Sequence, residues 1–471
     1  GRKLMSKYLY LIKNIGVLTL SNLGSKILAF LLIPLYTSVL STEQYGVFDL
    51  AQTTVSLCIP ILSINISSAA LRFALDKDKD KKDVFSVGIL YILFAIIIFS
   101  SAFICNKYVG ALNIFVDYTG IIILMFSSNI LYDYLSQYCR GIEKITDIAI
   151  AGIISSVTLL GSNIIFLLLI KAGLEGYMFA YCLSNIIPSF YLILKLKLWS
   201  YWRKPNNKRN LQKEMTDYSK PLVVDTISWW INNASDRYIV MAFCGASITG
   251  IYSVSYKIPS VLNLFQNIFN QAWLLSAVKE NDETKTTDFY ENVYKIYNTG
   301  MTVVCSGLLV FNKLIAKILF ANDFYNAWKF APFLMISVVF GGMCGLLGGM
   351  FAAVKQSRIN AMSSFSGACI NIMLNIPLTF FFNALGASFA TLMSYFTVWL
   401  IRLYKSYKLF EFTVEIKKDA LNYFVLLLQA VVQIAGLSLL RETFIEIILF
   451  VLVLYFSRNN FMLLLNKLLK R

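Results

Sequence analysis

Three cations lie inside otherwise apolar stretches of the sequence: Lys26, Arg237 and Lys257. A charged side chain within the hydrocarbon of a membrane is costly, so it usually faces a protein interior or a water-filled cavity. We therefore interpret these residues, together with Arg72 nearer the cytoplasmic surface, as the lining of a path through the protein.

Polar side chains at helical spacing accompany the cations in four apolar segments, which predicts a polar face on each of these helices. Two alternatives stay open: the polar side chains could only join helices by hydrogen bonds, and carboxylates could only neutralise the cations. Asp49 would then pair with Lys26, and Asp236 with Arg237 or Lys257. The residues that we expect to line the path are Asn22, Ser25, Asp49, Gln52, Ser56, Asn232, Asn233, Asp236, Tyr256, Asn263 and Asn267.

The sequence contains no histidine, which excludes histidine-ligated metals, Ser-His-Asp catalysis and histidine proton relays. Any coupling to H⁺ or Na⁺ would then use a carboxylate. We favour Asp225, because Ser228 and Asn232 follow at turn spacing and would complete an oxygen-rich site; a purely structural role is the alternative. No cofactor is expected, and the eight cysteines, none in a C-x-x-C pair, are interpreted as structural thiols.

The composition indicates a membrane protein. Only 14% of the residues are charged and the mean hydropathy is +0.65, whereas soluble proteins carry about 25% charged residues. Because one spanning helix needs about 20 apolar residues, the sequence predicts an all-α integral membrane protein with about fourteen transmembrane helices. The apolar runs lie at 14–36, 46–71, 84–105, 114–136, 147–170, 174–198, 221–243, 249–277, 289–311, 329–353, 359–382, 385–404, 419–440 and 443–457.

Most of the 42 Lys and Arg residues fall in alternate connections between these runs. Basic residues concentrate in cytoplasmic loops, so we expect both termini in the cytoplasm and the protein in a bacterial inner (cytoplasmic) membrane. We also expect Gly1 to Leu4 to precede a natural start at Met5, with no cleavable signal peptide. This topology accounts for the net charge of +16, so nucleic acid is not needed as a partner. We expect the basic stretch 195–220 to contact the anionic lipid headgroups of the bilayer.

The two halves of the sequence resemble each other. Gly176, Ala180 and Ser184, four residues apart, are matched by Gly386, Ala390 and Ser394, as in transporters built from repeated halves. Two other features predict architecture. Gly341, Gly345 and Gly349 favour close helix contact, and Pro60 and Pro259 predict a kink or hinge in their helices.

Short motifs resemble Wzx-type polysaccharide flippases of the multidrug/oligosaccharidyl-lipid/polysaccharide exporter superfamily. In the first half these are Ile33 to Tyr36, Leu40 to Gly46 and Ala70 to Phe73; in the second half, Asn232 to Ile239, Gly250 to Ser253 and Tyr256 to Pro259. The resemblance implies two six-helix lobes around a central cavity, plus two C-terminal helices. We place the first lobe at residues 1–200, a cytoplasmic basic linker at 201–220 and the second lobe at 221–410. The last two helices and the basic tail follow at 411–471.

The resemblance also implies a function without enzyme chemistry. Undecaprenyl-diphosphate-linked oligosaccharide repeat units would cross from the cytoplasmic to the outer leaflet by alternating access, for O-antigen, capsule or a related polymer, alongside a polymerase and other assembly proteins. The cations would offset the desolvation of the diphosphate. Trp229, Trp230 and Trp273 would stack on sugars or anchor the helices at the interface.

Three other functions remain as alternatives. A drug or small-molecule antiporter of the same superfamily is the nearest, although a basic cavity disfavours cationic drugs. A polysaccharide polymerase or ligase usually displays a large outer loop, which this sequence lacks apart from 312–328. An ion channel would need a filter or pore loop, and none is evident.

Overall fold

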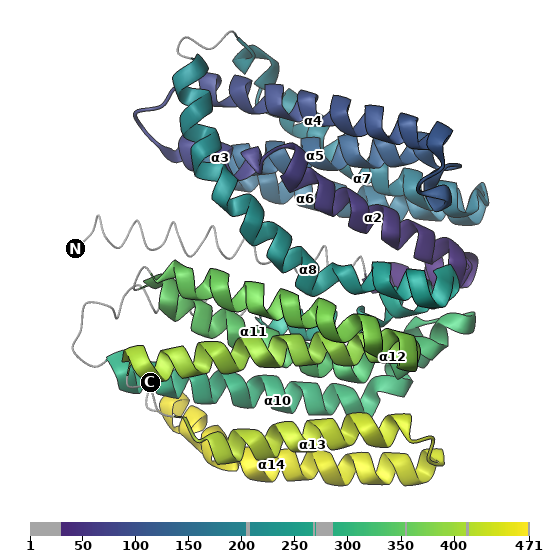
Figure 1. The fold of residues 1–471 in the computed structure, drawn as a ribbon, viewed down its shortest axis with the longest axis vertical. Coiled ribbons are helices and arrows are strands. Elements are labelled where there is room, and N and C mark those ends of the chain that lie inside the picture. Colours follow the sequence, from purple (N-terminus) through teal and green to yellow (C-terminus); the bar gives the residue numbers. More distant parts are fainter. Residues whose placement is uncertain are drawn as a thin grey trace. The chain divides into compact units, whose positions relative to one another are not determined.

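The computed structural model describes residues 30–203, 208–266 with Phe269, 286–353, 356–410 and 414–469. All regular elements within these ranges are helices (Figure 1). The chain divides inside α8 (Lys208–Ser255), between Ile227 and Ser228, into two compact units.

The first unit packs its helices around α5, which contacts each of the other long helices of this unit before α8. Two buried tyrosines of α5 fix α4 in place: Tyr134 donates to the carbonyl of Phe85 at 2.8 Å, and Tyr138 to that of Lys81 at 2.9 Å. The elements are α2 (Thr42–Leu62), α3 (Ile66–Leu75), α4 (Lys81–Val109), η1 (Asn113–Phe115), α5 (Thr119–Gly141), α6 (Ile145–Asn163), η2 (Ile164–Leu169), α7 (Gly173–Lys195) and η3 (Leu198–Tyr201).

The second unit contains the remaining helices, with α11 in contact with α10, α12 and α13. Both α8 and α12 consist of two helices, because Gly245 (φ 81°) and Asn383 (φ 53°) leave the helical conformation. The elements are α8 from Ser228 onward, α10 (Thr286–Leu319), η4 (Asn322–Lys329), α11 (Ala331–Ala353), α12 (Ser357–Phe410), α13 (Ile416–Ile434) and α14 (Leu439–Leu469).

Eight helices of the described ranges are long and apolar enough to cross a membrane. Two of these, with 58 and 53 residues, include the doubled helices α8 and α12, so each has the length for two crossings of about 20 residues. The spans predicted on either side of Gly245 and of Asn383 therefore correspond to separate helices.

The interruptions predicted at both prolines are confirmed. After Pro60 the helix ends at Leu62, and a turn with Asn65 in the left-handed region (φ 52°) separates α2 from α3. The backbone N–H of Asn65 donates to the carbonyl of Pro60 at 2.9 Å. In the second half α8 ends at Ser255, and a turn over residues 256–259 includes Pro259.

The glycines of the repeated motif are sites of close helix approach in both halves. A Cβ on Gly176 in α7 would lie 3.0 Å from the Cβ of Phe166 in the preceding element, η2. A Cβ on Gly386 would lie 2.0 Å from the carbonyl oxygen of Leu378, across the bend at Asn383. A larger residue cannot fit at Gly386 unless the two arms of α12 separate.

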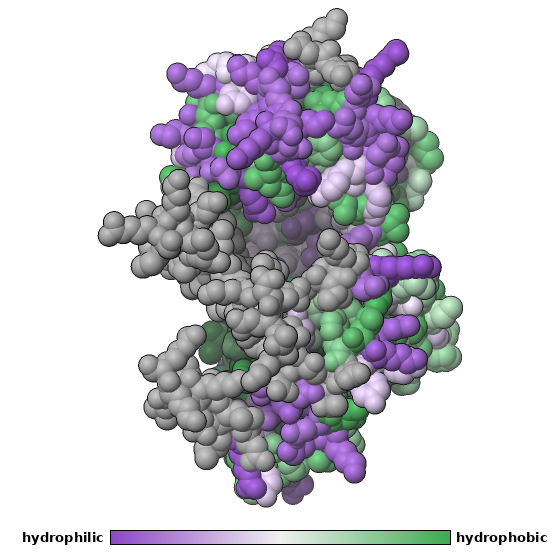
Figure 2. Space-filling model, turned by 90° about the vertical axis from the view of Figure 1, so that its left-hand side faces the viewer, coloured by the Kyte–Doolittle hydropathy of each residue, from purple (hydrophilic) through white to green (hydrophobic). Residues whose placement is uncertain are grey.

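The polar interval after α7 is partly helical, since α8 begins at Lys208 rather than at residue 221. Leu211, Met215 and Ser219 are buried there while Lys213 is exposed. Residues 208–220 of this polar interval therefore form an amphipathic helix. Figure 2 views the end of the molecule at which α4 begins and α7 ends, and hydrophilic side chains gather on it.

Candidate functional site

The predicted residues of the first unit occupy α2, α3 and the start of α8. Asp49 and Gln52 are half-buried on α2 and Ser56 is exposed. Arg72, in the last turn of α3, and Asp225, on α8, are both exposed. Four further predicted residues lie outside the described residues: Asn22, Ser25, Lys26 and Asn267.

In the second unit a buried carboxylate organises the predicted residues. Asp236, only 1% exposed, accepts hydrogen bonds on Oδ2 from the hydroxyls of Tyr252 at 2.6 Å, Thr391 at 3.3 Å and Tyr256. Its Oδ1 lies 3.7 Å from Nη1 of Arg237. Asp236 therefore neutralises Arg237 in this unit, one of the two pairings left open by the sequence.

Arg237 is held by three neighbours. Besides the ion pair with Asp236, its Nη1 donates to the carbonyl of Asn233 at 2.8 Å, and its Cζ lies 4.6 Å from the centre of the Tyr256 ring. A guanidinium at this distance from an aromatic ring is stabilised by the negative face of the ring. The positive charge of Arg237 is thus held next to the Tyr256 ring. Lys257 is half-buried in the turn that follows.

Asn232 has a different role from its neighbour Asn233. Asn232 is 3% exposed and donates to the carbonyl of Ser364 while it accepts from Ser394. It therefore joins α8 to both arms of α12. The amide of Asn233 accepts a hydrogen bond from the Tyr395 hydroxyl at 2.5 Å, and both of these residues face a pocket.

This pocket has a volume of about 270 Å³ and lies wholly within the second unit. Amides, hydroxyls and aromatic rings line this pocket together with small residues of α11. The residues that line it are Trp229, Asn233, Tyr256, Asn263, Gln266, Ser337, Val338, Gly341, Gly342, Gly345, Thr391 and Tyr395. Three of the predicted path residues, Asn233, Tyr256 and Asn263, are brought together here.

The glycine stripe of α11 contributes to this pocket. A Cβ on Gly341 would contact the Tyr395 ring at 3.5 Å, an ordinary packing distance, but a Cβ on Gly345 would meet nothing within 4 Å. The prediction that these glycines serve close helix contact is therefore wrong at Gly345, which leaves space in the pocket instead.

Sequence reasoning missed the residues that α12 contributes. Thr391 and Tyr395 are one turn apart on the helix that carries the repeated motif ending at Ser394. The motif located this helix correctly. Thr391 lies three residues before Ser394, and Tyr395 four residues after Thr391, so following helical spacing from Ser394 would have drawn attention to this hydroxyl pair.

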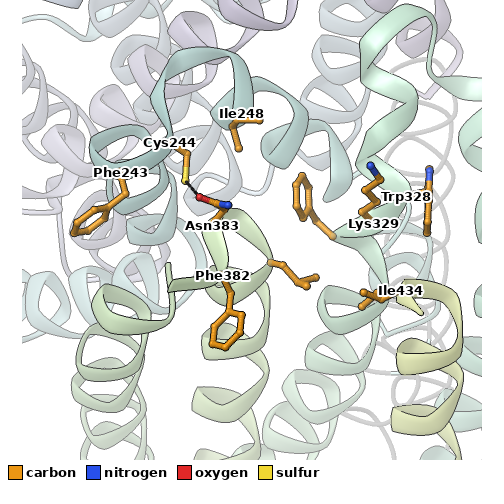
Figure 3. Close-up of a pocket in the computed structure, with 10 residues that line it drawn as sticks. Phe243, Cys244, Ile248, Trp328, Lys329, Phe382, Asn383 and Ile434 are labelled. Carbon is orange, nitrogen blue, oxygen red and sulfur yellow. Dashed lines mark hydrogen bonds between the residues drawn. The ribbon is translucent and has the colours of Figure 1, made fainter. Parts of the chain in front are cut away.

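A larger pocket of about 520 Å³ lies at another place in the second unit, where the chain bends at Gly245 and Asn383. Figure 3 shows Phe243, Phe382 and Ile434 in its walls, with Cys244 Sγ 3.8 Å from Asn383 Oδ1. It contains none of the predicted path residues. We assign the candidate site to the smaller pocket, because its lining includes three of the predicted path residues.

Comparison with known proteins identifies the family. The model of the family described as polysaccharide biosynthesis protein matches residues 11–275, more than half of the chain. The chain belongs to this family. The resemblance to Wzx-type flippases drawn from the sequence motifs is thereby confirmed.

Two curated relatives come from Haloferax volcanii. The "probable low-salt glycan biosynthesis flippase" Agl15 is 23% identical over 394 residues, which cover 80% of this chain and 79% of Agl15. The "probable flippase" AglR is 21% identical over 308 residues, 59% of each chain. These names describe flippases rather than enzymes, as the sequence led us to expect.

Solved structures share the fold. The lipid II flippase MurJ, in an inward closed conformation, aligns over 94% of this chain and 99% of its own with a TM-score of 0.71 at 15% identity. An inward-facing multidrug resistance MATE family transporter of the MOP superfamily aligns over 84% and 96% with a TM-score of 0.63 at 12% identity. The predicted all-α, multi-pass membrane fold is confirmed.

Proposed function

We propose that this protein is a flippase that moves an oligosaccharide on undecaprenyl diphosphate from the cytoplasmic to the outer leaflet by alternating access. It acts in a bacterial cytoplasmic membrane with both termini in the cytoplasm, and supplies O-antigen, capsule or a related polymer together with a polymerase. The family and the names of the relatives Agl15 and AglR support a lipid-linked glycan as substrate.

The observation that carries the proposal is the chemistry of the 270 Å³ pocket. Its polar lining is uncharged, and hydroxyls and amides that both donate and accept hydrogen bonds suit the hydroxyl groups of a sugar. The rings of Trp229, Tyr256 and Tyr395 add flat apolar faces. Because small-molecule sites usually span about 300–1,000 Å³, this pocket fits one part of an oligosaccharide.

The cations serve the diphosphate. Arg237 lies against the pocket-lining Tyr256 ring, and Lys257 is the next residue along the chain. We propose that they receive the phosphates with Lys26, and that Arg72 serves the cytoplasmic entrance. The phosphate would compete with Asp236 for Arg237. The 3.7 Å separation of Asp236 and Arg237 favours this exchange, because a tight bidentate ion pair would be harder to displace.

The proposal is tested with purified protein in proteoliposomes. A fluorescent lipid-linked oligosaccharide should become accessible on the opposite leaflet, and replacing Lys26, Arg237 or Lys257 by Ala should slow this movement at unchanged protein level. Arg237→Lys should rescue poorly if the guanidinium contacts two phosphate oxygens. The named relatives are archaeal, so undecaprenyl diphosphate and a shorter polyprenyl phosphate carrier are compared in parallel.

Two results would overturn the proposal. Gradient-driven movement of a soluble compound, with no movement of lipid-linked sugar, would identify an antiporter. A change in the sugar product itself would identify an enzyme.

A further inference from the structure

Buried polar side chains run along the face of α13 that packs against α10 and α14. Asn422, Gln429 and Gln433 are 4%, 0% and 1% exposed, respectively. Their spacing of seven and four residues places them on one face of the helix. Polar groups at such positions in membrane helices either join helices or serve an ion pathway.

The glutamines of α13 are well satisfied and account for the joining of helices. Gln429 accepts from Ser306 of α10 at 2.7 Å and donates to Glu446 of α14 at 2.8 Å. Gln433 accepts from Asn312 at 2.8 Å and donates to the carbonyl of Leu309 at 2.6 Å. Interhelical hydrogen bonding is a sufficient explanation for these amides.

Glu446 is not explained in the same way. Its side chain is 2% exposed. Oε2 accepts a hydrogen bond from Gln429. Within the described part of this helix packing, three buried oxygens have no hydrogen-bond partner: Oε1 of Glu446 and Oδ1 of Asn312 and Asn422. Of the three, only Glu446 belongs to an ionisable group. A buried carboxylate with one oxygen left without a partner carries a large desolvation cost that a proton would remove.

The charges around Glu446 do not balance unless one proton is bound. Glu442, one turn earlier on α14 and 4% exposed, pairs with Lys313 of α10 at 2.5 Å. From α13 the carboxyl of Glu446 meets the uncharged amides of Gln429 and Gln433. Two carboxyls thus share one ammonium group. The cluster is neutral when Glu446 is protonated and carries one negative charge when it is not.

At the end of α14 that begins at Leu439, residues 439–441 are exposed. Glu446 lies seven residues from this end, or about 10 Å at the rise of an α-helix. Lys313 has 21% of its side chain exposed and lies 4.0 Å from the centre of the Trp328 ring. Water that reaches Lys313 and Glu442 is therefore within one helical turn of Glu446.

We propose that Glu446, in the span predicted at residues 443–457, is a proton-binding site and exchanges its proton with water at the Leu439 end of α14. The carboxylate takes up a proton on Oε1 and becomes a neutral acid, while Lys313 and Glu442 stay ion-paired. Binding and release change the charge at the α10, α13 and α14 contact by one unit. If the flippase function holds, this site couples transport to a proton gradient.

Infrared difference spectroscopy of the full-length protein in lipid, after a pH jump, tests proton binding without any substrate. We expect a carbonyl band of a protonated carboxyl that titrates and is lost in Glu446→Gln. The matched control is Glu415→Gln, because Glu415 has 43% of its side chain exposed and should leave the band intact. A titrating band that persists in Glu446→Gln, or the absence of a titrating band in wild type, would overturn the proposal.

A second measurement tests coupling. In proteoliposomes a pH gradient should accelerate flipping by wild-type protein several-fold, and Glu446→Gln should lose this acceleration while it keeps flipping without a gradient. Retained acceleration in Glu446→Gln would overturn the coupling role, and loss in Asp225→Asn alone would assign coupling to Asp225. A failure of all flipping, with the infrared band intact, would count against the proposed function and leave the proton site standing.

Discussion

Ser394 Oγ donates a hydrogen bond to Asn232 Oδ1 at 2.9 Å, although 162 residues separate them in the chain. Asn232 Nδ2 also donates to the carbonyl of Ser364 at 3.1 Å. One buried amide therefore holds α8 against both arms of α12 and positions the helix that carries Asp236.

Replacing Asn232 by Ala should destabilise the protein. The change removes the hydrogen bonds that the Asn232 amide makes with the Ser394 hydroxyl and the Ser364 carbonyl, each worth about 0.5–1.5 kcal/mol. The Ser394 hydroxyl keeps a partner, because it also lies 2.9 Å from the Gly367 carbonyl oxygen. The free energy of unfolding in detergent measures the loss. Asn263→Ala is the control, because Asn263 lines the pocket and should affect transport more than stability. Equal stability losses in the two variants would contradict this role of Asn232.

Gly345 and Gly386 should respond in opposite ways to the same substitution. Gly386→Ala places a Cβ 2.0 Å from the Leu378 carbonyl oxygen, so we expect a loss of several kcal/mol or a failure to fold. Gly345→Ala meets nothing within 4 Å and should preserve or raise the thermal unfolding midpoint, since Ala favours a helix over Gly by about 1 kcal/mol. Gly345→Leu would fill the pocket and should slow flipping.

Asp236 and Arg237 should be coupled energetically. Asp236→Asn removes the charge that balances Arg237, and breaking a buried pair costs about 3–5 kcal/mol; because Arg237 is 14% exposed, the lower end applies. Arg237→Gln in the same protein should recover part of the loss. A double-mutant cycle of unfolding free energies measures the coupling, and additive effects would show that the pair contributes little.

A second ion pair should make stability depend on pH. Desolvation alone would raise the pKa of Asp80, but the backbone N–H of Lys82 and the Arg203 guanidinium outweigh it, so the pKa lies below its usual value. A carboxyl with a lowered folded-state pKa stabilises the protein above its unfolded pKa, about 3.9. This contribution is lost as the pH falls through the folded pKa.

The expected size of this effect is small. The Asp80 and Arg203 side chains are 51% and 37% exposed, so solvent screening limits the contribution to about 1 kcal/mol or less. Unfolding free energies of wild type and Asp80→Asn, measured from neutral pH to about pH 3, should converge at the acid end. A constant difference over that range would contradict the expected titration.

Labelling of introduced cysteines tests the orientation. In a background without native cysteines, Cys at the exposed positions Asn113 and Asn322 should react with an impermeant reagent in intact cells. Cys at Lys81 and Glu415, also exposed, should react only after permeabilisation. The reverse pattern would invert the proposed topology, and a mixed pattern would contradict an alternating arrangement of the spans.

Hydropathy, proline and glycine positions predicted much of the helical framework. Pro60 and Pro259 marked real interruptions, because a missing N–H and a fixed φ act on the local backbone wherever the segment lies. The first turns of α8 were not predicted, since residues 208–220 are polar overall and only Leu211, Met215 and a few others are buried. Their helix depends on packing of one face, which average hydropathy does not report.

The sequence by itself determined the class of protein and much of the helical framework, because composition and spacing are properties of one segment. It left open whether Asp236 pairs with Arg237 or with Lys257. Only the tertiary structure decided which polar groups meet. Thr391 reaches Asp236 across 155 residues, and Gln429 of α13 reaches Glu446 of α14, a contact absent from every prediction. A buried polar group is satisfied only by an atom about 3 Å away, and for these groups that atom belongs to another helix.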